Sequence, residues 1–179
     1  DGTIRLWDIV TGELLKILNI KKLHMSSIAF SFDGCKLVSC YLDGTIAVWK
    51  MPHGELQYQI TGRLDDYHLF SHPRSAQIAS VVKRYKEIQF WDLSSRNSVH
   101  YNKTDAGFIY SASFSPDGCF VACCDTDYAI YIWEVASRRL EYILKGHLDH
   151  IHYVIFRSDN LELVSVANDG IFIWDLKTQ

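Results

Sequence analysis

The five tryptophans of this chain lie on an almost regular lattice, and their spacing restricts what the chain can fold into. Trp7, Trp49, Trp91, Trp133 and Trp174 follow one another at intervals of 42, 42, 42 and 41 residues. A fixed period of about 40–45 residues is typical of folds that repeat one structural unit, in which each unit buries its apolar face against the next. The spacing therefore predicts a repeat architecture along the whole chain of 179 residues.

The residues around the tryptophans repeat as well. Asp-Gly-Thr-Ile-Arg-Leu-Trp at 1–7 matches Asp-Gly-Thr-Ile-Ala-Val-Trp at 43–49, and Gly-Glu-Leu follows at 12–14 and 54–56. Apolar residues alternate with residues of the opposite face, and turns such as Phe-Ser-Pro-Asp-Gly at 114–118 separate these segments. The alternation has the period of two that strands require, and it predicts several short antiparallel strands in each repeat.

In these features the chain resembles the WD-repeat β-propellers. The resemblance implies an all-β fold of four-stranded antiparallel blades around an axis, with the tryptophan at the end of the third strand. It covers essentially the whole chain. The dipeptide that names the family is present as Trp7-Asp8, Trp91-Asp92 and Trp174-Asp175, whereas Trp49-Lys50 and Trp133-Glu134 depart from it.

Counting strands in this frame predicts one propeller segment over 1–179, a partial arc of a little over four blades. Since an open arc leaves unpaired sheet edges, we expect a piece of a longer protein, whose ring is completed by the rest of that chain or by a second copy. The expected parts are the end of one blade at 1–20, complete blades at about 25–61, 65–103 and 106–145, and an incomplete blade at about 150–175.

Blades of this family often carry a buried hydrogen-bonded set of histidine, serine, aspartate and tryptophan. The last repeat holds all four, as His147, Ser165, Asp169 and Trp174. The same residue types form catalytic triads. We favour a structural tetrad and no catalytic residue, because the spacing recurs with the repeats and a tryptophan belongs to the set.

The other repeats keep this tetrad only in part. Lys21 and Asp105 stand where the histidine would be, and Cys123 stands where the serine would be. A catalytic set is not expected to decay gradually from repeat to repeat. The residues that remain are Ser39, Asp43 and Trp49 in the second repeat, Ser80 and Trp91 in the third, and Asp127 and Trp133 in the fourth.

Basic and aromatic residues gather in the loops expected on one face of two neighbouring blades. Such a mixture is common in protein-binding hot spots and grips phosphate or acidic side chains. Solvated loops balanced by Asp65 and Asp66 are the equally weighted alternative. The candidate partner-binding residues are Lys21, Lys22, Tyr41, Arg63, Tyr67, Lys83, Arg84, Tyr85 and Lys86.

Composition excludes several other classes of protein. No apolar run reaches the roughly 20 residues that span a bilayer, so no transmembrane segment is expected. The five cysteines do not form pairs at zinc-binding spacing, which favours a reduced, intracellular and most simply cytoplasmic protein. His150 and His152 have a spacing that can chelate a metal, but with only two ligands visible we predict no metal and no cofactor.

These features predict a non-enzymatic scaffold whose propeller surface recruits protein or peptide partners within a larger assembly. The sensing end of a multidomain signalling protein is one context that such a scaffold fits. The alternative is a binder of phosphorylated or acidic ligands, nucleic acid or phospholipid through the basic loops. A net charge of −3 counts against nucleic acid. An enzyme ranks last, because phosphate-binding glycine loops and zinc-protease motifs are absent from the sequence.

Overall fold

All seventeen regular elements that the structure describes are β-strands, which confirms the predicted all-β fold class. No helix in this part of the chain is long and apolar enough to cross a membrane. The computed structural model describes residues 2–20, 24–61, 67–82, 87–95, 97–103, 108–159 and 162–177.

The strands form five separate antiparallel sheets, which we number blades 1 to 5 in chain order. Within each blade, consecutive strands pair with each other. Blade 1 holds β1 (Thr3–Trp7) and β2 (Leu14–Asn19), and blade 2 holds β3 (Met25–Phe30), β4 (Lys36–Tyr41), β5 (Thr45–Lys50) and β6 (Glu55–Thr61). Blade 3 holds β7 (Tyr67–Ser71), β8 (Gln77–Val82), β9 (Glu87–Asp92) and β10 (Asn97–Lys103). Blade 4 holds β11 (Ser111–Phe114), β12 (Phe120–Cys124), β13 (Ala129–Glu134) and β14 (Leu140–Lys145), and blade 5 holds β15 (Ile151–Phe156), β16 (Glu162–Ala167) and β17 (Gly170–Asp175).

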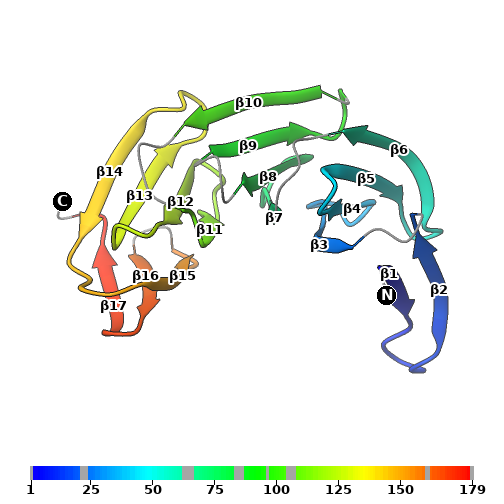
Figure 1. Cartoon of the computed structure of the whole chain (residues 1–179), viewed down its shortest axis with the longest axis horizontal. Helices are drawn as coiled ribbons and strands as arrows, with labels where there is room; N and C mark the ends of the chain where they lie inside the picture. The colour runs from blue at the N-terminus through cyan, green and yellow to red at the C-terminus, as the bar shows by residue number, and fades with distance from the viewer. Residues whose placement is uncertain are drawn as a thin grey trace.

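The blades follow one another along an open arc (Figure 1). The strands β2, β6, β10 and β14 form its outer rim, and the two chain ends lie at opposite ends of the arc. On the inner side, the first strands of neighbouring blades contact each other, from β3 to β7, β7 to β11 and β11 to β15. This is the arrangement that propeller blades adopt around an axis.

The core is a series of apolar layers, one between each pair of neighbouring blades. Ile46 and Val48 of blade 2 pack with Ile78 and Trp91 of blade 3. Equivalent clusters join blades 1 and 2, blades 3 and 4, and blades 4 and 5. The middle strands of blades 2 to 4 are therefore covered on both faces, and both residue sets of their alternating pattern are apolar, as in Ile46-Ala47-Val48.

A β-bulge recurs at the lattice tryptophan of each blade that has a fourth strand. The pairing register shifts just before Trp7, Trp49 and Trp133, and in blade 3 it shifts opposite Trp91. A bulge places one extra residue on the outer strand and increases the local twist. The repeated position of the bulge gives the outer strands a common geometry.

The turns between first and second strands follow one hydrogen-bonding scheme in blades 2 and 4. The Ser31 hydroxyl donates to Asp33 Oδ1 at 2.6 Å and accepts from the Lys36 backbone N–H at 2.9 Å. Ser115 makes the same two bonds, to Asp117 at 2.6 Å and from Phe120 at 2.9 Å. The Ser-x-Asp-Gly pattern of the sequence therefore folds these turns locally.

His72 connects blade 3 to the turn of blade 4. Its Nδ1 accepts from the Arg74 backbone N–H at 3.1 Å, so its Nε2 carries the proton and donates to the Gly118 carbonyl at 3.1 Å. The ring also meets Phe114 edge-on, with 5.1 Å between centroids. Burial is the main cause that lowers the pKa of His72. The neutral imidazole is thus a built-in part of the contact between the two blades.

Candidate functional site

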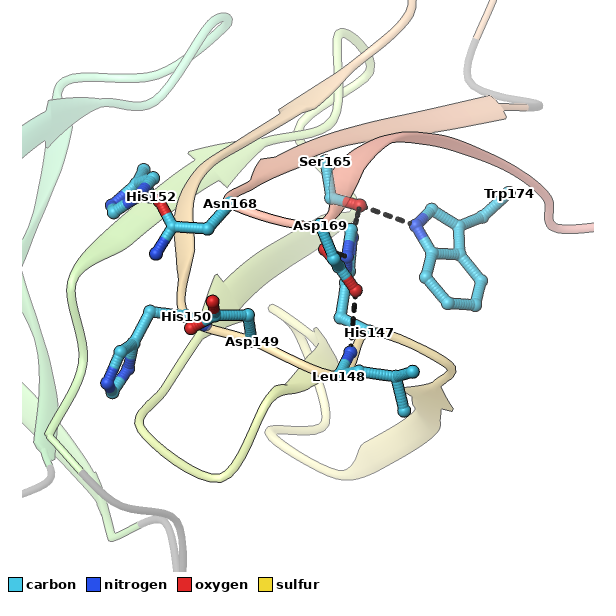
Figure 2. Close-up of polar contacts among 9 residues, drawn as sticks. All are labelled: His147, Leu148, Asp149, His150, His152, Ser165, Asn168, Asp169 and Trp174. Atoms are coloured by element: carbon cyan, nitrogen blue, oxygen red, sulfur yellow. Dashed lines mark hydrogen bonds and ion pairs between the residues drawn. The ribbon is translucent and has the colours of Figure 1, made fainter.

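Blade 5 joins the four tetrad side chains into one hydrogen-bonded chain (Figure 2). Trp174 Nε1–H donates to Ser165 Oγ at 2.8 Å. His147 Nε2 lies 2.6 Å from Ser165 Oγ, and His147 Nδ1 lies 2.6 Å from Asp169 Oδ1. The residues come from β16, β17, the turn between them, and the loop before β15. The structure therefore brings together all four residues that the sequence groups.

Each hydrogen bond of the tetrad has a definite donor, and all of them point toward Asp169. A carboxylate accepts only, so His147 Nδ1–H donates to Asp169, and Nε2 accepts from the Ser165 hydroxyl. Asp169 Oδ2 also accepts from the Leu148 backbone N–H at 2.6 Å. That backbone hydrogen bond is the main cause that lowers the pKa of Asp169, and the bond from His147 adds to it. The charged carboxylate is thus held in place by two donors.

Access separates this arrangement from a hydrolytic triad. Ser165 is completely buried, and its oxygen already bonds both the indole of Trp174 and the imidazole of His147. A nucleophilic serine needs a free lone pair directed at a substrate carbonyl. The geometry of Ser165 supports a stabilising role for the tetrad.

Phe172 also belongs to this group, although the spacing of the repeats did not predict it. Its ring lies against the His147 imidazole, with 4.0 Å between centroids and an interplanar angle of 30°. It also packs on Trp174 at 5.7 Å. The strand pairing places Phe172 opposite Ser165, where blade 2 has Ala47 and blade 3 has Gln89. The only sequence signal is its place two residues before the lattice tryptophan.

Blades 2 and 3 keep the serine–tryptophan bond of the tetrad. Trp49 Nε1 donates to Ser39 Oγ at 2.9 Å, and Trp91 Nε1 donates to Ser80 Oγ at 2.8 Å. Asp43, which the sequence groups with the first pair, instead accepts from the backbone N–H of Thr45 at 2.9 Å. The carboxylate of Asp43 therefore stabilises its own turn.

Tyr41 corrects one prediction from the sequence. It is 0% exposed, and its hydroxyl lies 3.3 Å from Ser39 Oγ. Burial is the main cause that raises the pKa of Tyr41. Tyr41 is therefore a core residue and contributes nothing to a partner-binding surface.

Blade 4 lacks the bond because Cys123 replaces the serine. Among the described residues the Trp133 Nε1 finds no oxygen or nitrogen acceptor, and the Cys123 thiol at the serine position is only a weak acceptor. Asp127 is exposed at the turn, where its backbone N–H donates to Asp125 Oδ1 at 2.9 Å. The structure therefore does not join Asp127 and Trp133 into a tetrad.

Most of the predicted basic surface falls outside the described residues. Tyr67 begins β7, and its side chain is likewise not described. The predicted partner-binding residues that lie outside the description are Lys21, Lys22, Arg63, Lys83, Arg84, Tyr85 and Lys86.

A different set of exposed side chains lies on the loops of blades 4 and 5. We call residues 108–110, 125–128 and 146–150 the junction surface, because they lead into these blades or join their middle strands. Phe108, Tyr110, Tyr128 and Leu148 are exposed there, Leu148 to 84%. This surface carries large apolar side chains without a cover in the described structure.

His150 belongs to the junction surface, whereas His152 has another partner. The His150 ring makes T-shaped contacts with Tyr128 and Tyr110, at centroid distances of 5.2 and 6.2 Å. His152 Nε2 lies 2.7 Å from Asn168 Oδ1 (Figure 2). The pairing register of β15 shifts between Ile151 and Tyr153. Among the described residues, no three His, Cys, Asp or Glu side chains are grouped for a metal ion.

A cleft of about 810 Å³ runs along the inner strands beside this surface. Its walls come from β7, β11 and β15 and include Tyr110 and His152. Pockets of several hundred Å³ accommodate drug-sized molecules or side chains. The cleft thus continues the junction surface toward the inside of the arc.

Comparison with known proteins identifies the repeat. The WD40 family model (WD domain, G-beta repeat) matches residues 12–50 and 96–134. Each match begins near the outer strand of one blade, β2 or β10, and ends with the third strand of the next, β5 or β13. The sequence repeat and the blade are therefore offset by one strand.

Similar proteins match nearly the whole chain. It is 24% identical over 99% of its length to Pre-mRNA-processing factor 19 homolog 2 of Arabidopsis thaliana, and 27% identical over 100% to Nuclear distribution protein nudF of Emericella nidulans. It is 24% identical over 94% to Apoptotic protease-activating factor 1 of Mus musculus. The chain spans 35%, 36% and 14% of these relatives.

The repeated tryptophans, the four-stranded antiparallel blades and the two family-model matches agree. This chain carries WD40 repeats and is similar to WD-repeat β-propeller proteins along nearly its whole length.

Proposed function

We propose that the chain is a non-enzymatic scaffold that recruits protein or peptide partners into a larger assembly. The observation that carries this proposal is the junction surface, where Phe108, Tyr110, Tyr128 and Leu148 are exposed on neighbouring loops. Uncovered apolar and aromatic groups on a rigid frame are typical of protein-binding sites. The burial of Ser165 supports a role without catalysis.

The relatives support the shared framework rather than one process. Their names refer to pre-mRNA processing, nuclear distribution and protease activation. These are unrelated activities, so the common part is the WD-repeat surface, and the partners of this chain follow from its own loops. The absence of disulfides among the five cysteines, all of which are described, supports the intracellular location that we propose.

We also propose that further blades complete the ring. The exposed face of blade 5 is apolar, with cross-strand rows that include Ile155, Val164 and Ile173. At the other end, Trp7 is 54% exposed, whereas Trp49 is 4% exposed. Both end faces thus resemble the faces that are buried between blades.

The recruitment proposal is tested by affinity capture from cell extract with mass-spectrometric identification. We expect the double variant Phe108→Ser, Leu148→Ser to lose the captured partners while its thermal melt stays unchanged. Phe32→Ser is the matched control, because it removes an exposed aromatic ring from a turn on the opposite face.

The basic loops supply the second arm of this test. A triple change of Lys83, Arg84 and Lys86 to Glu removes partner capture if these loops hold an acidic or phosphorylated ligand. Capture that survives both sets of changes contradicts recruitment through either surface.

A further inference from the structure

Tyr128 occupies a turn position that other blades reserve for glycine. Its φ is 59°, in the left-handed region, and the equivalent residues Gly44 and Gly170 have φ of 84° and 138°. A side chain disfavours this conformation, which glycine adopts without strain. Residues held in unfavourable backbone conformations cluster at functional sites. The geometry of the turn therefore does not explain why a tyrosine occupies this position.

The ring of Tyr128 completes a small aromatic group. Tyr128 and Tyr110 each make a T-shaped contact with the His150 ring, at centroid distances of 5.2 Å for Tyr128 and 6.2 Å for Tyr110. The three residues come from three different loops of two blades. Both tyrosine rings stay partly exposed, at 37% for Tyr128 and 44% for Tyr110. Both tyrosines are thus accessible to a partner at the boundary between blades 4 and 5.

The same loops carry negative charge. Asp127 precedes Tyr128 and Asp149 precedes His150. Asp149 Oδ1 accepts from the His150 backbone N–H at 2.6 Å, which holds the carboxylate close to His150 (Figure 2). The junction surface contains no lysine or arginine; Lys145 lies just before it, at the end of β14. Electron-rich rings and carboxylates both attract cations.

We infer that this aromatic and acidic group binds a lysine or arginine side chain of a peptide partner. The inference rests on the proposed scaffold function and specifies the chemistry of its partner. The cation would lie against the rings of Tyr110 and Tyr128, with Asp127 and Asp149 balancing its charge. The cleft beside Tyr110 offers room for the neighbouring residues of the peptide.

Three fluorescein-labelled peptides of otherwise identical sequence test this inference by fluorescence anisotropy. They carry lysine, norleucine or glutamate at one central position, and norleucine keeps the aliphatic stem without the charge. The lysine peptide is expected to bind about tenfold more tightly than the norleucine peptide, as a partly desolvated cation–π contact with carboxylate support implies. The glutamate peptide is expected not to bind.

Tyr128→Gly is the decisive variant, because it removes the ring and restores the residue that the turn favours. We expect about fivefold weaker binding of the lysine peptide, with a melting temperature equal to or above that of the parent. Asp127→Asn is expected to weaken binding by about two- to threefold and to reduce its dependence on salt. Phe32→Ala, on the opposite face, is the control and leaves binding unchanged.

Equal affinity for the lysine and norleucine peptides overturns the inference, as does unchanged binding by Tyr128→Gly. If the lysine peptide fails while partner capture still depends on Phe108 and Leu148, the scaffold function stands and only its cationic ligand is wrong. If capture is also independent of the junction surface, the proposed recruitment surface is wrong as well.

Discussion

The imidazole of His147 shows how one residue can hold several segments together. It links Ser165 of β16 to Asp169 in the following turn, and Phe172 covers its ring. A buried hydrogen bond contributes little net stability, but a buried group left without its partner costs its full desolvation. The histidine therefore matters chiefly through the groups that depend on it.

Replacing His147 by alanine is expected to lower the free energy of unfolding by about 1–3 kcal/mol. The change removes partners from the buried Ser165 hydroxyl and from Asp169, and it leaves a void against Phe172. Urea denaturation followed by circular dichroism measures the effect. His150→Ala in the same loop is the control, with an expected change within about 0.5 kcal/mol. Equal stability of His147→Ala and the parent contradicts a structural tetrad.

The sequence could group the tetrad because its spacing recurs, but it could not show which side chains turn inward. Tyr41 is the last residue of a strand and lies next to a turn. At such a position the sequence pattern does not distinguish a buried side chain from an exposed one. Its hydroxyl lies beside Ser39 in a blade that has Lys21 at the histidine position. Phe172 was not predicted as a neighbour of His147, because this contact depends on the pairing register of the strands, which a single sequence does not reveal.

At the level of elements, the blade is held by its neighbours as much as by its own strands. The turn of blade 4 meets His72 of blade 3 at Gly118, which has a φ of 78°. A Cβ atom at Gly118 would lie 2.3 Å from Cε1 of His72 and 2.5 Å from its Nε2. Gly34 holds the same turn position in blade 2, with a φ of 67° and open space around it.

This pair of glycines separates backbone strain from the contact between blades. Both Gly34→Ala and Gly118→Ala place a side chain in a left-handed turn. Each variant is therefore expected to lose about 1 kcal/mol of free energy of unfolding from backbone strain. Gly118→Ala is expected to cost about 1–3 kcal/mol beyond that, because the new methyl group collides with His72. Urea denaturation of both variants measures the difference.

A His72→Ala background should reduce the excess cost of Gly118→Ala, since it removes the atoms that the methyl group meets. If the two glycine variants lose the same free energy of unfolding in the parent, the contact between blades 3 and 4 adjusts to the methyl group without cost, which contradicts the prediction.

The four-stranded blades themselves were predictable from the period, the alternation and the turns. The β-bulges were not, because they arise from pairing between the third and fourth strands rather than from either strand alone. The exposed group around Tyr128 was missed for a related reason. Its members lie in three separate loops, and only the stacking of blades brings them together.

For the whole molecule, the decisive feature is the pair of apolar end faces. Ile171 and Ile173 of the last strand are each 68% exposed, and Trp7 and Ile17 are exposed at the other end. Interior layers of the arc bury equivalent positions between blades. An arc with such ends gains hydrophobic free energy by covering them.

The chain on its own is therefore expected to self-associate through these faces at micromolar concentration. The double variant Ile171→Lys, Ile173→Lys should raise the dissociation constant about tenfold or more, because burying unpaired charges is costly. Multi-angle light scattering over a concentration series measures this. Leu42→Lys, at an exposed turn of blade 2, should leave association unchanged. A parent chain with the mass of one copy at every concentration contradicts the expectation.

The one-strand offset between the matched repeats and the blades has a consequence for the duplication of repeats in such genes. Residues 12–50 supply the outer strand of one blade and three strands of the next. A duplication or loss of one such unit would therefore leave every blade built from two heritable segments. Each newly copied segment must pair with its neighbour's strands before any sheet is complete. Selection on a repeat is thus selection on two adjoining blades at once.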